Sequence, residues 1–228
     1  MEPVRSTDPE PGFLEGIRDI TSQEGIVLIF DEITSGFRVN EGGVHLHYNV
    51  KPDLAVFGKA LGNGFPISAV VGVGKVMSAI QDTFVSSTFW TERVGFTAAL
   101  ATLEKFKTFQ VHRQLIDSGK AINNAWERAA EASKLKIKVT GLEPLTHIDF
   151  IHEKASVIQT LYTQEMLKRG NLVGSSAYST FAYDHEVLGQ FEQDTGIVFK
   201  FLKEAIDGGN PEGLLMSDTK HSGFQRLS

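Results

Sequence analysis

The sequence predicts an α/β protein in which a partial mixed or parallel sheet is followed by a smaller α+β domain. Two continuous apolar runs, Ile26–Phe30 and Leu54–Phe57, are typical of parallel strands that are buried on both faces. Amphipathic helices lie before and after these runs, as in layered α/β folds. From about Gln110 the pattern changes to long helices with a few alternating strands. This change places the domain boundary near residue 110.

The first predicted domain, residues 1–110, starts with a helix between Pro11 and Gly25. Proline suits a first helical turn and glycine suits a helix end, and apolar side chains recur on one face between them. The stretch Thr34–Asn49 has no clean period, which favours an irregular, functional loop. Trp90 and the phenylalanines are interpreted as core residues. The remaining elements expected here are strands at Ile26–Phe30, Leu54–Phe57, Ile67–Val73 and Phe84–Val85, and a helix at Glu92–Phe109.

The second predicted domain, residues 111–228, combines helices with alternating strands, which is the pattern of an α+β fold. Three helices, two strands and a short strand pair are expected. The helices are expected at Val111–Leu135, Ser156–Arg169 and His185–Ile206. The strands are expected at Ile137–Val139 and Leu145–His152, and the short strand pair within Leu172–Tyr183.

The composition excludes several classes of function. With 22 Lys and Arg against 28 Asp and Glu, the formal charge of the 228 residues is −6, which does not fit a nucleic-acid or anionic-membrane surface. Without cysteine, the chain has no disulfide, thiolate nucleophile or Cys-ligated metal. No apolar run approaches the roughly 20 residues of a membrane-spanning helix, and no secretory signal is visible after Met1. The sequence therefore predicts a soluble, cytoplasmic protein.

Two charged residues follow the ends of predicted strands. Asp31 closes the strand Ile26–Phe30, and Lys59 follows the strand Leu54–Phe57. Ligands of open α/β sheets bind in the crevice beyond the carboxyl ends of the strands, so a carboxylate and an amine there would face one small molecule. The alternative is that Asp31 is a cap and Lys59 a solvated charge at a strand end. Spacing alone leaves both interpretations open.

The sequence around these two residues resembles that of the class III pyridoxal-phosphate aminotransferases. Phe30–Arg38 is similar to the family's pyridine-binding segment, and Lys51–Leu54 with Gly58–Pro66 is similar to its Schiff-base lysine segment. The resemblance is closest to the glutamate-1-semialdehyde aminomutase-like branch and extends loosely over nearly the whole chain. The further segments that carry it are Met1–Pro3, Gly12–Leu14, the helix from Glu92 and Glu165–Gly170. It implies a fold-type-I transferase, with residues 1–110 as the second half of the cofactor-binding large domain and residues 111–228 as the C-terminal small domain.

The resemblance implies a role for each of four residues. Lys59 would be the catalytic lysine that forms the imine with pyridoxal 5′-phosphate and moves the proton, and Asp31 would accept the N–H of the pyridinium ring. Ile33, two residues further along an extended chain, would pack against one ring face. Thr88 would reach the cofactor phosphate of a neighbouring subunit, which implies a homodimer with a shared active site. Ser87 replaces the family's usual glycine before this threonine, and the following Phe89–Arg93 also departs from its pattern.

Other candidate residues carry weaker arguments. Arg38 could bind a substrate carboxylate, although a structural ion pair with a neighbouring acid is the favoured interpretation. His45 and His47 have a spacing compatible with metal ligation, but no third ligand is near, so no metal site is predicted. Gly72–Lys75 resembles part of a phosphate loop without its upstream glycine.

The predicted function is amino-group transfer from a small-molecule donor to a carbonyl acceptor through a ping-pong cycle, by a transaminase or an aminomutase. Because family members are about twice as long, the sequence is expected to be a fragment that lacks the Gly/Ser-rich phosphate turn and a stacking aromatic residue. A second polypeptide that supplies this half is the alternative. Two other functions stay open: a catalytically inactive subunit or binding protein with the same fold, and a small domain that binds an anion between Asp31 and Lys59.

Overall fold

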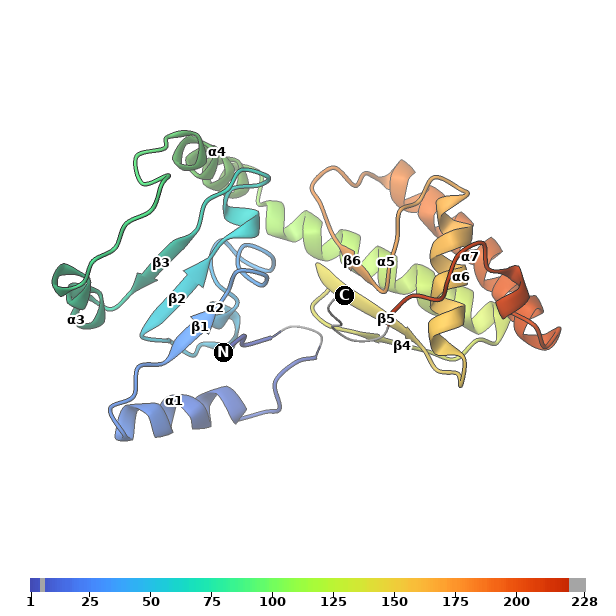
Figure 1. The fold of residues 1–228 in the computed structure, drawn as a ribbon, viewed down its shortest axis with the longest axis horizontal. Helices are drawn as coiled ribbons and strands as arrows, with labels where there is room; N and C mark the ends of the chain where they lie inside the picture. Colours follow the sequence, from blue (N-terminus) through green and yellow to red (C-terminus); the bar gives the residue numbers. More distant parts are fainter. Residues whose placement is uncertain (5–6, 222–228) are drawn as a thin grey trace. The chain divides into compact units, whose positions relative to one another are not determined.

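The computed structural model describes residues 1–4 and 7–221, and the chain divides into two compact units, Met1–Ile116 and Asp117–Ser228 (Figure 1). The division falls within the long helix α5 (Val111–Ser133). The sequence instead placed a boundary near residue 110. We describe each unit by itself.

The first unit is built on a three-stranded mixed sheet in the order β1-β2-β3. Strand β1 runs parallel to β2, and Asp31 is level with Val56 in their register. Strand β3 is antiparallel to β2. The elements of this unit are α1 (Phe13–Gln23), β1 (Ile29–Asp31), α2 (His45–Tyr48), β2 (Leu54–Phe57), η1 (Lys59–Leu61), β3 (Ala69–Gly72), α3 (Gly74–Met77), η2 (Ser78–Asp82) and α4 (Val94–Thr108).

The first strand is not buried on both faces, and that prediction is wrong. Leu28 and Phe30 are buried against Leu14 of α1 and against Val50, whereas Ile29 between them is 43% exposed. The alternation arises because α1 covers only one face of β1, beside which it runs in Figure 1. The apolar run therefore predicted the strand correctly, but it did not predict that one face of the strand stays exposed.

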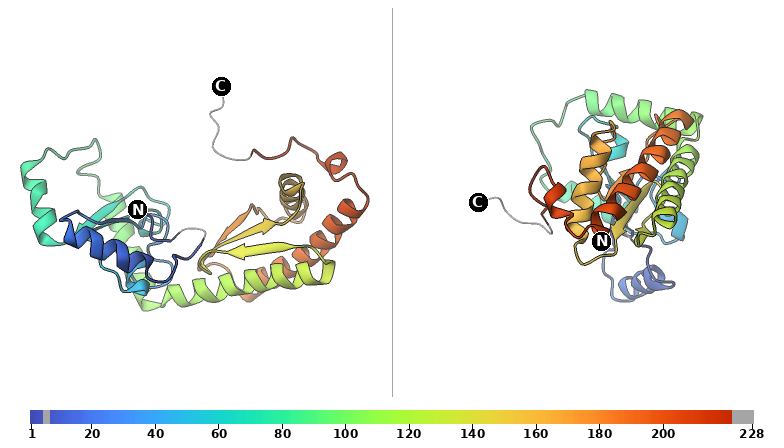
Figure 2. Two further views of the ribbon diagram at one scale, coloured as in Figure 1. Left: turned by 90° about the horizontal axis from the view of Figure 1, so that it is seen from below. Right: turned by 90° about the vertical axis from the view of Figure 1, so that its right-hand side faces the viewer.

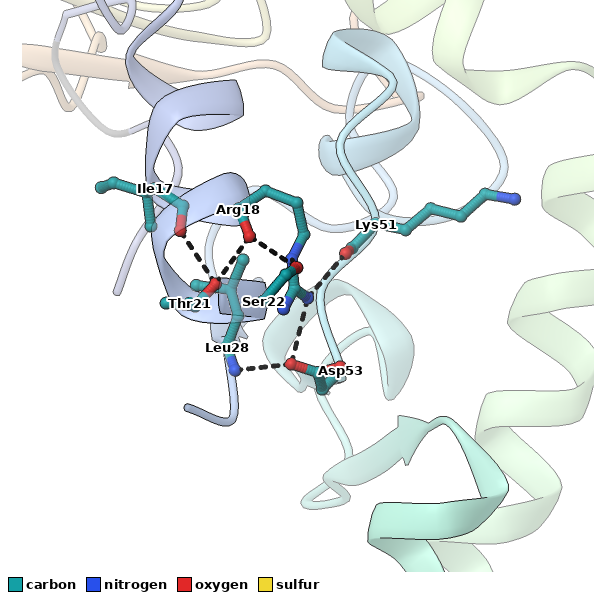
Figure 3. Close-up of polar contacts among 7 residues, drawn as sticks. All are labelled: Ile17, Arg18, Thr21, Ser22, Leu28, Lys51 and Asp53. Carbon is teal, nitrogen blue, oxygen red and sulfur yellow. Dashed lines mark hydrogen bonds and ion pairs between the residues drawn. The ribbon is translucent and has the colours of Figure 1, made fainter. Parts of the chain in front are cut away.

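A hydrogen-bonded ion pair fixes the start of β1 to the start of β2 and to α1 (Figure 3). The Leu28 amide donates to Asp53 Oδ2 at 2.7 Å, and Arg18 of α1 donates to the same oxygen at 3.0 Å and to the Lys51 carbonyl at 3.2 Å. The Leu28 amide and, with it, the Arg18 guanidinium hold the pKa of the Asp53 carboxyl below its ordinary value. This contact sets the relative position of the two strands that end at Asp31 and Phe57.

The segment between η2 and α4 forms an irregular connection (Figure 2). The predicted strand at Phe84–Val85 is wrong, since neither residue pairs with a strand and Phe84 is 95% exposed. Trp90 is also exposed, so its interpretation as a core residue is wrong in this chain. The predicted helix at Glu92–Phe109 is confirmed as α4, and Glu92 caps it by accepting hydrogen bonds from the Val94 and Gly95 amides.

The second unit packs helices α5, α6 and α7 against an antiparallel sheet in the order β4-β5-β6. One apolar cluster joins Trp126 of α5, Ile148 of β5, Tyr162 of α6 and Phe199 of α7, all of which are almost fully buried. Between Leu172 and Tyr183 the structure has one strand instead of the predicted pair. The elements are β4 (Ile137–Thr140), β5 (Leu145–Phe150), α6 (Ala155–Leu167), β6 (Ser176–Tyr178), α7 (His185–Asp207) and η3 (Glu212–Leu214). Among the described residues, no helix is long and apolar enough to cross a membrane.

Candidate active site

Asp31 and Lys59 lie at the same edge of the first sheet. Asp31 is the last residue of β1, and Lys59 follows the parallel strand β2 after Gly58. The carboxylate of Asp31 is partly buried and its Oδ1 accepts a 3.0 Å hydrogen bond from the Ile33 amide. Within the described residues, its other oxygen accepts no hydrogen bond. A carboxylate with a free oxygen and a lysine amine thus stand beyond the carboxyl ends of neighbouring strands, where α/β sheets bind ligands.

Lys59 has an unusual backbone conformation and a fixed polar partner. Its φ angle is +39°, in the left-handed region, which costs a residue with a Cβ atom about 1–2 kcal/mol. Its Nζ atom donates a 2.7 Å hydrogen bond to Oγ1 of Thr34, a residue 25 positions earlier. Thr34 was not singled out in the sequence, because nothing in the local pattern shows that the loop after β1 returns to the end of β2.

Ile33 lies beside Gly58, the residue before Lys59, but in a turn and not on an extended chain as predicted. The chain turns directly after Asp31, since the Ile33 amide bonds the Asp31 side chain and the Gly36 amide donates to the Glu32 carbonyl at 2.8 Å. An added Cβ on Gly58 would lie 3.5 Å from Ile33 Cγ2. The Ile33 side chain therefore contributes an apolar surface next to Gly58, at the edge that carries Asp31 and Lys59.

The loop after β1 is organised around a buried carboxylate. Glu32 has no exposed surface, and its Oε2 accepts from Ser35 Oγ at 2.7 Å and from the Val44 amide at 2.8 Å. Its Oε1 lies 2.9 Å from the His45 amide and 2.7 Å from His45 Nδ1. Burying a carboxylate is costly unless it is fully hydrogen-bonded. These partners offset that cost and hold the loop closed.

A glycine is required where this loop approaches the carboxylate most closely. A Cβ atom on Gly43 would lie 2.6 Å from Glu32 Oε1 and 2.3 Å from the His45 ring. Glycine alone lets the backbone pass this close. The sequence predicted an irregular, functional loop here, but it did not reveal that Glu32, next to the candidate Asp31, is its anchor.

The structure does not bring Thr88 to this group. Thr88 is exposed in the connection between η2 and α4, and in the described parts of the chain no hydrogen bond joins it to Asp31, Ile33 or Lys59. Arg38 Nε donates to the Thr34 carbonyl at 3.2 Å. Arg38 therefore supports the backbone of the loop whose Thr34 side chain holds Lys59.

The two loop histidines have other partners than a metal. His45 is paired with Glu32, and the His47 ring packs edge-on against Tyr48 with centroids 5.1 Å apart. In residues 1–4 and 7–221, no group of three or more His, Cys, Asp or Glu side chains is arranged to hold a metal ion.

Known proteins share this sequence over most of its length. Residues 2–180 match the family described as Aminotransferase class-III. The chain is 36% identical over 202 residues to the 3-aminobutyryl-CoA aminotransferase of Cloacimonas acidaminovorans (strain Evry), covering 87% of this chain and 48% of the relative. It is 33% identical over 183 residues to the glutamate-1-semialdehyde 2,1-aminomutase of Methanosphaera stadtmanae, covering 76% and 43%. The chain thus spans about half the length of the curated relatives it matches.

Solved structures indicate the same class of protein as these relatives. The PLP internal aldimine form of the FumI protein of Sphingopyxis sp. MTA144 superimposes with a TM-score of 0.87 at 26% identity, covering 95% of this chain and 54% of that one. An omega-transaminase from Sphaerobacter thermophilus gives 0.76 at 25% identity, covering 85% and 48%. The fold is therefore that of the fold-type-I pyridoxal-phosphate-dependent transferases.

Within that class, the chain belongs to the class III aminotransferase family. Family and fold together indicate pyridoxal phosphate as the cofactor. The resemblance of the segments around Asp31 and Lys59 to the class III aminotransferases is thereby confirmed at the level of the family.

Proposed function

We propose that this chain provides the lysine and the ring-binding carboxylate of an enzyme that transfers amino groups with pyridoxal phosphate. The observation that supports this most directly is the placement of Asp31 and Lys59 at the carboxyl ends of two neighbouring parallel strands. Substrates would be an amino donor and a carbonyl acceptor, or one amino aldehyde for an aminomutase.

The residues at this sheet edge fit the chemistry of the cofactor. When bound, pyridoxal phosphate supplies an aldehyde, which condenses with an amine with loss of water, and a ring that accepts the electron pair of an adjacent carbon. The site offers one amine at Lys59, one carboxylate oxygen of Asp31 without a described partner, and the apolar side chain of Ile33. A pyridinium ring, whose N–H group carries positive charge, matches such a combination of a carboxylate, an amine and an apolar surface.

Each of these residues has a distinct task. Asp31 would accept the ring N–H and, as an anion, would keep that nitrogen protonated. The Ile33 side chain would pack on a ring face and fix its tilt. Lys59 would act as the nucleophile and, once displaced by the substrate amine, would move a proton between two carbons as a general base.

The assembly that completes the site is also a proposal. Thr88 is exposed, and among the described residues no hydrogen bond joins it to Asp31 or Lys59, which suits a side chain that serves a neighbouring copy. We propose a homodimer in which Thr88 reaches the cofactor phosphate of the other subunit. Exposed Phe89 and Trp90 beside it provide apolar area for such an interface.

The proposal is tested by trapping the lysine. The protein is incubated with pyridoxal phosphate, reduced with borohydride and digested, and the modified peptide is identified by mass spectrometry. We expect the adduct on Lys59, its absence in Lys59→Ala, and unchanged labelling of the exposed Lys51. A reducible adduct that persists in Lys59→Ala at another lysine would show that Lys59 has been assigned the wrong role.

A further inference from the structure

We infer that Thr34 is a positioning residue that holds the Lys59 amine in place before it reacts. The inference rests on the proposed function, in which Lys59 is the nucleophile. Its basis is the 2.7 Å hydrogen bond between Lys59 Nζ and Thr34 Oγ1. Within the described residues, the structure shows no other hydrogen bond of the Lys59 amine.

The hydroxyl group of Thr34 has a fixed position. Thr34 is only 7% exposed, and its carbonyl accepts a hydrogen bond from Arg38 Nε at 3.2 Å. The turn that contains it is closed by the Gly36 amide and by Ser35, which both bond Glu32. Because threonine is branched at Cβ, its χ1 angle is also restricted. The oxygen is therefore a rigid acceptor supported by a buried network.

Lys59 needs such a partner more than an ordinary lysine does. Its long side chain is flexible and loses much rotamer freedom when it is fixed. Its backbone already has a left-handed φ of +39°, a conformation that persists only where the surroundings impose it. Lys59 is also exposed as a residue, so solvent would otherwise allow its amine many positions. The bond to Thr34 selects one of these positions at the sheet edge beside Asp31.

A hydroxyl group can hold the amine in both protonation states. Threonine Oγ1 accepts a hydrogen from the ammonium form, and its own O–H can donate to the lone pair of the neutral amine. The contact can therefore survive the loss of the proton that makes the amine nucleophilic. A carboxylate in this place would accept only and would favour the charged form.

The experiment compares Thr34→Val and Thr34→Ala, which remove the hydroxyl, with Thr34→Ser, which keeps it. The rate of adduct formation with pyridoxal phosphate at Lys59 is measured by borohydride trapping and quantitative peptide mass spectrometry. We expect both hydroxyl-free variants to react about three- to tenfold more slowly at Lys59, the range of one hydrogen bond, and Thr34→Ser to stay within about twofold of the wild type. Labelling of Lys51 provides the internal control.

A second readout does not depend on the cofactor. In protein labelled with ¹³C-lysine, relaxation of Lys59 Cε should show an ordered side chain in the wild type and in Thr34→Ser, and a mobile one in the other two variants. Amide exchange at Val44 and His45 verifies that the loop is still folded. If the loop opens in Thr34→Val, the comparison between Thr34→Ala and Thr34→Ser decides whether the hydroxyl group orders the Lys59 side chain.

The outcomes separate the two proposals. An adduct at Lys59 with the same rate and the same Cε mobility in all variants would overturn the role of Thr34 and leave the proposed function intact. An adduct at another lysine would contradict the proposed function, while a change of Lys59 mobility in the hydroxyl-free variants alone would still support the contact with Thr34.

Discussion

Different interactions stabilise the interior of each of the two units of the chain. In Asp117–Ser228, side chains from α5, β5, α6 and α7 meet in one closed apolar cluster around Trp126, Tyr162 and Phe199. In Met1–Ile116, α1 and β1 share a small cluster of Leu14, Leu28, Phe30 and Val50. The loop of the candidate site is instead ordered by hydrogen bonds to a buried carboxylate, Glu32.

The units also differ in the apolar surface that they expose. Within residues 1–4 and 7–221, most of the exposed large hydrophobic side chains belong to the first unit, including Ile29, Val71, Phe89, Trp90 and Leu100. Where exposed apolar side chains form a contiguous patch, they mark an interaction surface. The comparison teaches that the second unit owes its stability to its own core, whereas the first unit carries the candidate site and exposes apolar side chains that its own residues leave uncovered.

The largest expected effect is in the core of the second unit. Phe199→Ala removes a fully buried ring that packs on Phe150 and Tyr162 at centroid distances of 5.5 and 5.8 Å. We expect a loss of about 3–5 kcal/mol in the free energy of unfolding. Urea unfolding followed by tryptophan fluorescence, to which the buried Trp126 contributes, measures it. The matched change in the first unit, Phe96→Ala at a 58% exposed position, should cost no more than about 0.5 kcal/mol. Equal losses would contradict the comparison.

A smaller effect is expected at the polar anchor of the first unit. Glu32→Gln replaces a carboxylate oxygen with an amide group that cannot accept a hydrogen bond, so partners among Ser35, Val44 and His45 are lost. We expect the loop to be destabilised by about 2–3 kcal/mol. Hydrogen exchange of the Val44 and His45 amides should accelerate, while Glu41→Gln, an exposed position of the same loop, should leave it unchanged. Undiminished protection in Glu32→Gln would show that the loop does not depend on the carboxylate.

The ion pair between α1 and the two parallel strands adds a dependence on pH. Because the pKa of Asp53 is lowered on folding, its contribution is present at pH values above the ordinary aspartate pKa of about 4 and is lost as the pH falls through the lowered value. We expect Asp53→Asn to cost about 1 kcal/mol at pH 7, a modest value because the pair is partly exposed.

Exchange of the Leu28 amide at pH 7 and in acid measures this contribution. The difference between the wild type and Asp53→Asn should shrink in acid, and the exposed Asp19→Asn should show no such difference. A difference that stays constant into acid would exclude the charge of Asp53 as its cause.

The smallest effect is expected on the surface of the second unit. Lys203 and Asp207 form an exposed pair one turn apart in α7. Asp207→Asn should change the free energy of unfolding by less than about 0.5 kcal/mol, since exposed pairs of this kind are weak. The urea experiment described for Phe199→Ala measures this change. A larger loss would show that the exposed face of α7 contributes to the free energy of unfolding as its buried face does.

Much of the fold could be predicted from periodicity. The helices α1, α4, α5, α6 and α7 and the strands β2, β4 and β5 were expected close to their observed bounds. The apolar period is strong in α1, α5 and α7 and weak in α4 and α6. The failures at Phe84–Val85 and within Leu172–Tyr183 concern short apolar stretches. In these, packing on other elements decides the conformation, and the local pattern does not record that packing.

The sequence by itself determined the chemical types at the candidate site, which are a carboxylate at Asp31 and an amine at Lys59. Each lies at the end of an apolar run, in segments that resemble the class III aminotransferase family. Only the tertiary structure decided which groups form hydrogen bonds with Lys59 and within the adjoining loop. Lys59 bonds Thr34, 25 positions away in the sequence, and Glu32 bonds Val44 and His45, 12 and 13 positions away. The physical reason is that a local pattern fixes the period and the end of a strand, whereas the partner of a polar side chain depends on how the chain folds back after that end.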